Sequence, residues 1–352
     1  MQNNIKYLIA KLAAEHSLTL DEYALLIASS DAELDLYLAE LAVKTRKDIY
    51  SNFVYVRGLI EISNICKNNC YYCGIRRGNH NCERYRLTHE QILECASEGY
   101  SLGFRTFVMQ GGEDSFFSDE ILCGIIKDIK LKFPDCAVTL SLGERSYESY
   151  KILREAGADR YLLRHETADK AHYAKLHPAE MSYDNRMQCL YNLRKLNYQV
   201  GCGFMVNSPF QTINNLAQDL KFIESFKPEM CGIGPFIPHH DTQFRDYEIN
   251  KLKSLELTCR LLSIIRLIHP SVLLPATTAL GTIHPQGREM GIKAGANVVM
   301  PNLSPVAVRK KYELYDNKIC TGDESAQCKN CLEARMRSIG YEIVSDRGDF
   351  KN

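Results

Sequence analysis

From about residue 50 onward, short apolar runs alternate with longer amphipathic stretches. This alternation is typical of strand–helix units that build a parallel sheet. Eight such runs occur, at residues 54–62, 106–110, 137–142, 160–166, 199–206, 230–236, 271–278 and 296–301. Helix start signals stand between them, for example at Thr88, Ser182 and Thr212. The pattern predicts an α/β fold of the TIM-type (β/α)8 barrel class.

Two further segments flank the predicted barrel of residues 51–303. Residues 1–50 read as two or three helices, with a capping-type entry between Ser17 and Glu22, and we expect them to pack on the barrel. Residues 304–352 form a C-terminal extension that contains cysteines and shows little periodicity. With 352 residues and 45% apolar content, one large domain with terminal additions is the economical interpretation.

The charge balance argues against polyanionic partners. Lysine plus arginine and aspartate plus glutamate each number 43, so no net field attracts nucleic acid or an anionic membrane. The N-terminal segment lacks the apolar run of a signal peptide, and no stretch approaches the ~20 apolar residues of a membrane span. We expect a cytoplasmic protein, a monomer by default, with a small-molecule partner.

Three of the 14 cysteines stand close together, at Cys66, Cys70 and Cys73, directly after the first strand-like run. A cubane iron–sulfur cluster normally takes four thiolates, so three local cysteines would leave one iron open to another ligand. Two alternatives remain, a zinc site completed by a distant residue and three incidental thiols. A second group lies in the C-terminal extension, at Cys320, Cys328 and Cys331. The other eight are scattered singly and are interpreted as small buried hydrophobic residues.

The first group, C-KNN-C-YY-C with Tyr72 before its last cysteine, resembles the signature of radical S-adenosylmethionine (SAM) enzymes. The resemblance implies a 4Fe-4S cluster bound by Cys66, Cys70 and Cys73, with SAM chelated by the fourth iron. One electron then cleaves SAM to methionine and a 5'-deoxyadenosyl radical. The radical carries the chemistry, so no catalytic side chain is expected.

Polar residues stand at the ends of the second and third predicted strands, where barrel enzymes place their chemistry. Gly111, Gly112 and Glu113 resemble the GGE motif of the superfamily, whose glycines permit close backbone approach to SAM. Thr139 and Ser141 share one face of the third strand, which we assign to the lumen.

Arg164 and Glu166 likewise share one face of the fourth predicted strand. Burying them would be costly without partners, so they need each other, a ligand or both; a purely structural ion pair is the alternative. Arg186, in the first turn of the next helix, could reach back over the barrel mouth to a carboxylate. Thr277 and Thr278 place hydroxyls at the end of the seventh run, where backbone hydrogen bonds are the alternative role.

Longer sequence strings indicate which family within the superfamily this chain resembles. They are SLGE (141–144), DRYLLRHET (159–167), GIGPFIPHHDT (232–242), PATTALGTI (275–283) and NVVMPN (297–302). Together they closely resemble the [FeFe]-hydrogenase maturase HydE family, from about residue 50 to residue 335. The resemblance implies SAM contacts from Tyr72, Gly111, Ser141, Arg164, Glu166 and Arg186. It implies a substrate site lined by Thr139, Thr277, Thr278 and Tyr312.

The same resemblance implies a reaction and its partners. The substrate would be a small organometallic iron complex with carbonyl, cyanide and cysteine ligands, made by the maturase HydG. The product would pass to the scaffold maturase HydF, and a ferredoxin or flavodoxin would donate the electron. Cys320, Cys328 and Cys331 resemble an accessory site of some HydE proteins that holds a 2Fe-2S or 4Fe-4S cluster, with zinc as the alternative.

Other functions remain open. Biotin synthases resemble this chain around the first cysteine group, but have an asparagine-rich YNHN motif where it has LLRHE. A methylornithine synthase would not be expected to carry the second cysteine group. From a different class, an iron–sulfur carrier or scaffold would need two clusters but neither the GGE motif nor Arg164 and Glu166.

Overall fold

The computed structural model describes residues 2–319 and 329–351 of the chain. Its centre is a parallel sheet of six strands in the order β2-β3-β4-β5-β6-β8. The strands up to the barrel's end are β1 (Phe53–Val56), β2 (Gly58–Ser63), β3 (Thr106–Gly111), β4 (Ala137–Ser141), β5 (Arg160–Leu162), β6 (Gln199–Cys202), β7 (Met205–Val206), β8 (Met230–Cys231), β9 (Gly234–Pro235) and β10 (Val298–Val299).

Single bridges complete the ring of parallel contacts between β8 and β2. They join Met230 to Leu273, Pro275 to Val298, and Leu59 to Asn302. In addition, β1 pairs in parallel with β10. The eight predicted runs therefore follow one another around the ring in sequence order, as expected of a TIM-type barrel.

The regular strands are shorter than the apolar runs that predicted them. The run at 160–166 is a strand only as far as Leu162, and the run at 271–278 forms single bridges before Thr278 begins a helix. The run at 199–206 breaks at Gly203, where a Cβ would lie 2.0 Å from the carbonyl oxygen of Gly232. An apolar run indicates that a segment is buried on both faces of the sheet. A segment can stay buried beyond the point where its hydrogen bonds to the neighbouring strand end, so the run is longer than the strand.

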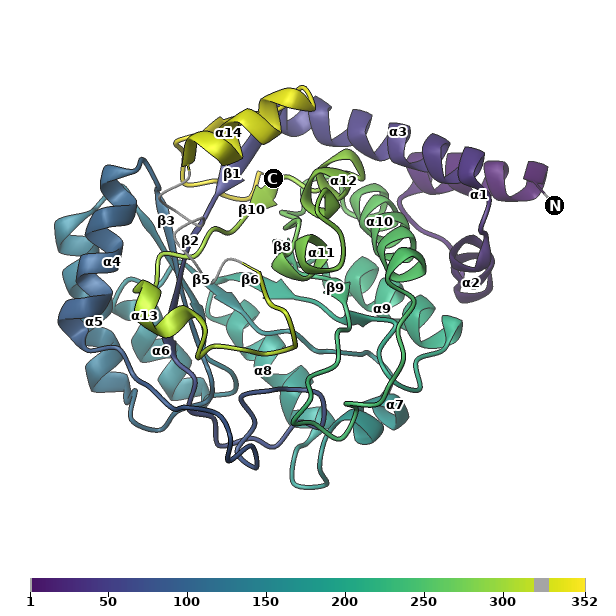
Figure 1. Ribbon diagram of the computed structural model, residues 1–352. Coiled ribbons are helices and arrows are strands. Elements are labelled where there is room, and N and C mark those ends of the chain that lie inside the picture. Colours follow the sequence, from purple (N-terminus) through teal and green to yellow (C-terminus); the bar gives the residue numbers. More distant parts are fainter. Residues whose placement is uncertain (1, 320–328, 352) are drawn as a thin grey trace.

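Helices surround the ring on its outer side (Figure 1). They are α4 (His89–Ser101), α5 (Asp119–Lys132), α6 (Tyr147–Glu155), α7 (Lys170–Leu176), α8 (Tyr183–Lys195), α9 (Ile213–Phe226), α10 (Lys251–Ile268), α11 (Thr278–Ile283) and α12 (Gly287–Lys293). Thr88, Ser182 and Thr212 are N-caps whose side chains accept backbone hydrogen bonds. The start signals in the sequence therefore mark real helix starts.

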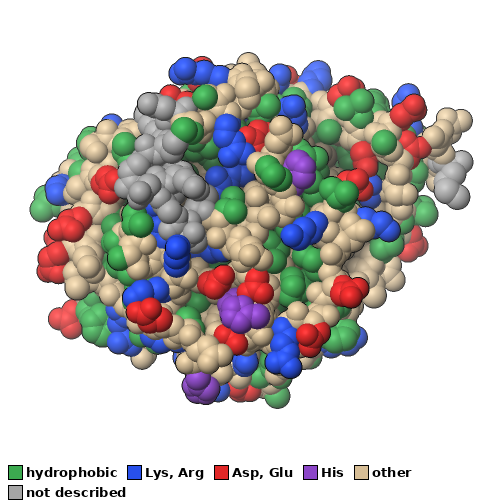
Figure 2. Space-filling model, viewed as in Figure 1, with side chains coloured by type: hydrophobic (Ala, Val, Ile, Leu, Met, Phe, Trp, Pro, Cys, Tyr) green, Lys and Arg blue, Asp and Glu red, His purple; other side chains and the backbone are tan. Residues whose placement is uncertain are grey.

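Three helices precede the barrel: α1 (Gln2–Glu15), α2 (Leu20–Ala28) and α3 (Ala32–Tyr50). Helix α3 packs along α10 and α2 packs along α9, on the outside of the ring (Figure 1). Thr19 caps α2 and forms a capping box with Glu22. Across residues 2–319 and 329–351, no helix combines the length and apolar character that crossing a membrane requires. Figure 2 shows acidic and basic side chains interspersed over one face, in keeping with the zero net charge.

After the barrel come α13 (Val306–Arg309), α14 (Lys329–Ser338) and β11 (Glu342–Val344). Strand β11 pairs in parallel with β1, a contact that the weak periodicity of this segment did not predict. Cys331 lies in α14, whereas Cys320 and Cys328 fall outside the described residues. The second cysteine group therefore stays a prediction.

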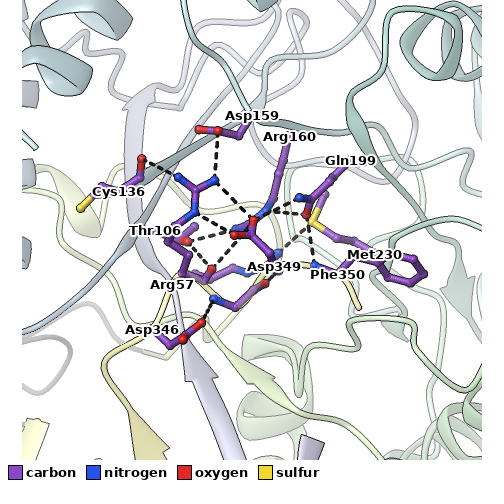
Figure 3. A network of polar contacts seen from close by, with 12 residues as sticks. Arg57, Thr106, Cys136, Asp159, Arg160, Gln199, Met230, Asp346, Asp349 and Phe350 are labelled. Carbon is purple, nitrogen blue, oxygen red and sulfur yellow. Dashed lines mark hydrogen bonds and ion pairs between the residues drawn. The ribbon is translucent and has the colours of Figure 1, made fainter. Parts of the chain in front are cut away.

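The tail after β11 closes the amino-terminal end of the barrel (Figure 3). Arg160 and Gln199, the first residues of β5 and β6, donate hydrogen bonds to Asp349 Oδ1 at 2.6 and 3.1 Å. Arg347 Nε donates to the other carboxylate oxygen of Asp349 at 2.8 Å. Because Arg160 is fully buried, Asp349 supplies the negative charge that makes its burial tolerable.

Replacing Asp349 by alanine (Asp349→Ala) should destabilise the metal-free protein, because it leaves the Arg160 guanidinium buried without a carboxylate. We expect the free energy of unfolding at neutral pH to fall by about 1 to 2 kcal/mol, a value reduced for the 40% exposure of the Asp349 side chain. Burial disfavours ionisation of Asp349, but Arg347 and Arg160 outweigh it and lower the pKa of the carboxyl. The stabilisation is thus complete above the ordinary aspartate pKa of about 3.9 and is lost as pH falls through the lower folded value.

Urea denaturation at a series of pH values measures this effect. The free energies of unfolding of Asp349→Ala and of the unchanged protein should converge as the pH is lowered. Asp346→Ala is the matched control, since Asp346 lies in the same tail and accepts a hydrogen bond from the Gly348 N–H at 2.7 Å. An equal loss of stability in both variants would show that the contacts of Asp349 do not hold the tail.

Candidate active site

A cavity of about 370 Å³ lies inside the ring, and many of its lining residues stand at or beyond the carboxyl ends of the strands. All residues predicted to bind the first cluster, SAM or the substrate line it. They are Cys66, Cys70, Cys73, Tyr72, Gly111, Ser141, Arg164, Glu166, Arg186, Thr139, Thr277, Thr278 and Tyr312. The faces of β4 and of the segment after β5 that were assigned to the lumen therefore do point into it.

The three thiols lie on a loop that follows β2. Burial raises the pKa of each thiol, that of Cys73 to about 12, so all three are protonated in the metal-free chain. Among the described residues, the one group of three potential metal ligands within 4.8 Å of one another is His239, His240 and Asp316. The three thiols form no such group, so at least one pair of their sulfur atoms lies more than 4.8 Å apart. Thiolates on one zinc ion lie about 3.8 Å apart, so this spacing fits a cluster better than a single zinc ion.

Arg84, a residue that the sequence analysis did not single out, holds the cysteine loop together. Its Nη1 donates to the carbonyl oxygens of Asn64 and Ile75 at 2.6 and 2.8 Å. Its Nη2 donates to those of Arg76 and Asn79 at 2.7 and 2.9 Å. One guanidinium thus fixes both ends of the loop, as its fork of donors allows.

The GGE motif at the end of β3 fits closely against this loop. A Cβ on Gly112 would lie 2.3 Å from the carbonyl oxygen of Ile65 and 2.8 Å from Cβ of Cys66, so only glycine is tolerated there. The Glu113 N–H donates to Cys66 Sγ at 3.4 Å. The motif therefore sets the approach of the loop to the barrel.

Arg186, in the first turn of α8, does reach back over the barrel mouth. Its Nε lies 2.8 Å from Glu144 Oε1, and its Nη2 lies 3.9 Å from Glu113 Oε1. Burial opposes its charge, but Glu144 and Glu113 hold the pKa of Arg186 well above the ordinary value. The carboxylates that it contacts thus belong to the chain itself.

Several buried polar atoms in the cavity have no hydrogen-bond partner within residues 2–319 and 329–351. They are Arg57 Nε, Thr139 Oγ1, Arg164 Nε and Nη2, Glu166 Oε2, Arg186 Nε and Thr277 Oγ1. Arg164 and Glu166 form an ion pair at 3.2 Å, which leaves these atoms without well-aligned hydrogen bonds. Buried polar groups are normally satisfied, so this set is suited to a polar ligand with both donor and acceptor groups.

Tyr72 is fixed by His177, which no sequence signal identified. The Nδ1 of His177 donates to the Tyr173 carbonyl at 2.9 Å, so its Nε2 accepts from the Tyr72 hydroxyl at 3.2 Å. Burial lowers the pKa of His177 to about 3 and keeps the ring neutral. The neutral ring holds the tyrosine at the cavity wall beside the cysteines.

The segment after the barrel brings Tyr312 and Lys318 to the cavity. Lys318 Nζ donates to Glu61 Oε1 at 2.5 Å and to the Tyr312 carbonyl at 2.7 Å. The Tyr312 hydroxyl accepts a hydrogen bond from Gln110 at 3.3 Å. Glu61 is a charged residue inside the first apolar run, which indicates that it has a partner of opposite charge. The sequence alone did not identify Lys318 as that partner.

Comparisons with known proteins agree with this geometry. The sequence profile of the radical SAM superfamily matches residues 60–223. The chain is 42% identical to the [FeFe] hydrogenase maturase subunit HydE of Thermotoga maritima, over 92% of each protein. It is 29% identical to the 3-methylornithine synthase of Methanosarcina acetivorans, over 92% of this chain and 89% of that protein.

A crystal structure of methylornithine synthase shares the fold, with a TM-score of 0.81, 24% identity, and coverage of 96% of this chain and 97% of that one. The chain is more similar in sequence to the maturase HydE than to the 3-methylornithine synthase, at 42% against 29% identity. This agrees with the strings at the strand ends, which resemble HydE. The chain belongs to the [FeFe]-hydrogenase maturase HydE family of radical SAM enzymes.

Proposed function

We propose that this enzyme of hydrogenase maturation acts on a small iron complex bearing carbonyl, cyanide and cysteine ligands, in assembly of the [FeFe]-hydrogenase active site. The observation that carries the proposal is one cavity lined by the three thiols and by unpartnered polar atoms. An iron–sulfur carrier needs no such cavity.

Cys66, Cys70 and Cys73 would hold the 4Fe-4S cluster, and a spacing of their thiols too wide for one zinc ion supports this. The cluster and SAM, when bound, supply a reductive one-electron cleavage that yields a 5'-deoxyadenosyl radical. The chain's own part is to bind and orient. Arg164 offers a cation to the SAM carboxylate, and Glu166 offers an acceptor to the ribose hydroxyls. Tyr72, Gly111, Ser141 and Arg186 would complete the SAM site.

The substrate would lie beyond SAM, against Thr139, Thr277, Thr278 and Tyr312. Thr277 is the N-cap of α11, yet its hydroxyl makes no capping hydrogen bond and stays available to a ligand. Hydroxyl donors suit cyanide nitrogen and carboxylate oxygen as acceptors. The cavity wall is otherwise largely apolar, which excludes water from a reactive radical.

The remaining assignments rest on the family resemblance. We propose that HydG supplies the substrate, that HydF receives the product, and that a ferredoxin or flavodoxin donates the electron in the cytoplasm. We also propose an accessory 2Fe-2S or 4Fe-4S cluster at Cys320, Cys328 and Cys331. The division into residues 1–50, 51–303 and 304–352, and a monomeric state, belong to the same proposal.

Removing one thiol of the first group should abolish SAM cleavage. Cys73→Ser should lose the 4Fe-4S absorbance and electron paramagnetic resonance signal of its first cluster after anaerobic reconstitution, because serine is a poor ligand for iron–sulfur clusters. With SAM and dithionite, it should form no 5'-deoxyadenosine. Cys123→Ser, at a half-buried thiol on α5, should behave as the unchanged protein does.

Two results would contradict the assignment. A fully loaded Cys73→Ser protein would show that this thiol is not a ligand. Absence of 5'-deoxyadenosine from the loaded, unchanged protein would favour the carrier.

Removing a substrate hydroxyl should impair maturation while SAM binding persists. Thr139→Val keeps the shape of the side chain and removes the unpartnered hydroxyl, so hydrogenase activation should fall roughly tenfold. SAM affinity should stay unchanged. Thr258→Val is the matched control, because the buried Thr258 hydroxyl donates to the Ser254 carbonyl of its own helix at 2.6 Å.

Deleting the gene in a hydrogenase-containing host tests the substrate class more broadly. Loss of hydrogenase activity with normal biotin supply is expected. A biotin requirement in place of that loss would refute the proposed substrate.

A further inference from the structure

Glu166 carries its carboxylate into the cavity from an unusual backbone conformation. Its φ is 66°, in the left-handed region that side-chain-bearing residues rarely adopt. The residue lies beyond the end of β5, and its N–H donates to the Gly203 carbonyl at 3.0 Å. Its own carbonyl accepts from the Met205 N–H at 3.3 Å. Such a conformation persists only where the surroundings hold it in place.

The preceding residue, His165, is fully buried and makes two side-chain hydrogen bonds. Its Nδ1 accepts from the Gly203 N–H at 3.3 Å, so its Nε2–H donates to Asp219 Oδ1 at 3.2 Å. The ring contacts Phe204 and Phe222, with centroids 6.0 and 4.8 Å away. Burial lowers the pKa of His165 to about 3, in agreement with a neutral ring that carries one proton.

Asp219, on α9, contacts the chain on both sides of Glu166. The same Oδ1 atom that accepts from His165 also accepts from the Ala168 N–H at 2.5 Å. The second oxygen, Oδ2, has no hydrogen-bond partner in the described part of the chain. Burial raises the pKa of Asp219 well above its ordinary value.

A buried carboxyl with one unsatisfied oxygen is a costly way to fill space between a helix and a sheet. An apolar residue would pack there without that cost. The hydrogen bonds made by Asp219 and His165 go to each other and to backbone around Glu166, at Gly203 and Ala168. Their placement fits orientation of this segment better than general stabilisation of the core.

We propose that His165 and Asp219 are positioning residues, which hold residues 165–168 so that the Glu166 carboxylate points at SAM. The inference rests on the proposed role of Glu166 in SAM binding. It assigns a function to a pair that does not line the cavity.

His165→Phe tests the pair, since phenylalanine keeps an aromatic ring and removes both ring hydrogen bonds. In the metal-free protein, hydrogen–deuterium exchange should increase in peptides covering residues 163–168. After reconstitution, the dissociation constant for SAM, measured by calorimetry, should rise roughly tenfold, a typical effect of removing a residue that orients a ligand-binding group. Cluster content should stay unchanged.

Two variants of Asp219 separate hydrogen bonding from packing. Asp219→Asn keeps an oxygen that can accept from both His165 and Ala168, so SAM affinity should remain close to that of the unchanged protein. Asp219→Leu removes the acceptor and should weaken SAM binding as His165→Phe does. If His165→Phe does not fold, the comparison of Asp219→Asn with Asp219→Leu decides alone. Equal losses of SAM affinity in these two variants would overturn the proposal.

Leu220→Ala is the matched packing control, because Leu220 is the next residue of α9, is fully buried and has no polar side-chain atom. It should lower thermal stability without raising exchange at 163–168 or weakening SAM binding. A loss of SAM affinity equal to that of His165→Phe would overturn the positioning role.

Glu166→Ala, which removes the acceptor oxygens, separates this inference from the proposed function. Weaker SAM binding in Glu166→Ala, together with unchanged affinity in His165→Phe and Asp219→Leu, would overturn the positioning role alone. Unchanged affinity in Glu166→Ala would overturn the proposed role of Glu166 in SAM binding, and the positioning role of His165 and Asp219 with it.

Discussion

The ring of parallel strands is the constraint on which the site depends, because it brings the carboxyl ends of distant segments to one rim. Thr139 lies on β4, Arg164 follows β5 and Thr277 follows the bridge at Pro275, yet all three line one cavity. Polar atoms that are buried within that ring must find partners or a ligand. The same enclosure that makes these groups costly to bury would make them selective for a ligand that satisfies them.

Charge at the mouth is balanced within the chain before any cofactor binds. Arg186 contacts Glu144 and Glu113, while Lys318 contacts Glu61. Arg164, Glu166 and Arg186 each keep a buried side-chain atom without a hydrogen-bond partner in the described chain, whereas Lys318 and Glu61 do not. The first three side chains are therefore the ones best placed to meet a ligand.

Local patterns in the sequence were enough for the fold and for much of the cavity lining. Apolar runs and capping residues act over a few positions, so they predicted the order of strands and the starts of α4, α8 and α9. Strand β11 was missed because it has only three residues and the periodicity of its segment is weak. The cysteine, GGE and LLRHE strings pointed to residues that do line the cavity. Arg84, His177 and Asp219 were missed because their partners are backbone groups or side chains that only the folded chain brings near them.

The four hydrogen bonds from Arg84 to backbone carbonyls affect the entropy cost of binding a cluster to the cysteine loop. A loop whose backbone is already fixed has lost most of its conformational entropy during folding, so little remains to be lost when a ligand binds. Lysine could not replace this arginine, because a single ammonium cannot span carbonyls at both ends of the loop. The loop is therefore preorganised for its ligand. Arg84 sets its shape through backbone carbonyls, and in the described chain it makes no hydrogen bond to any of the three cysteine sulfur atoms.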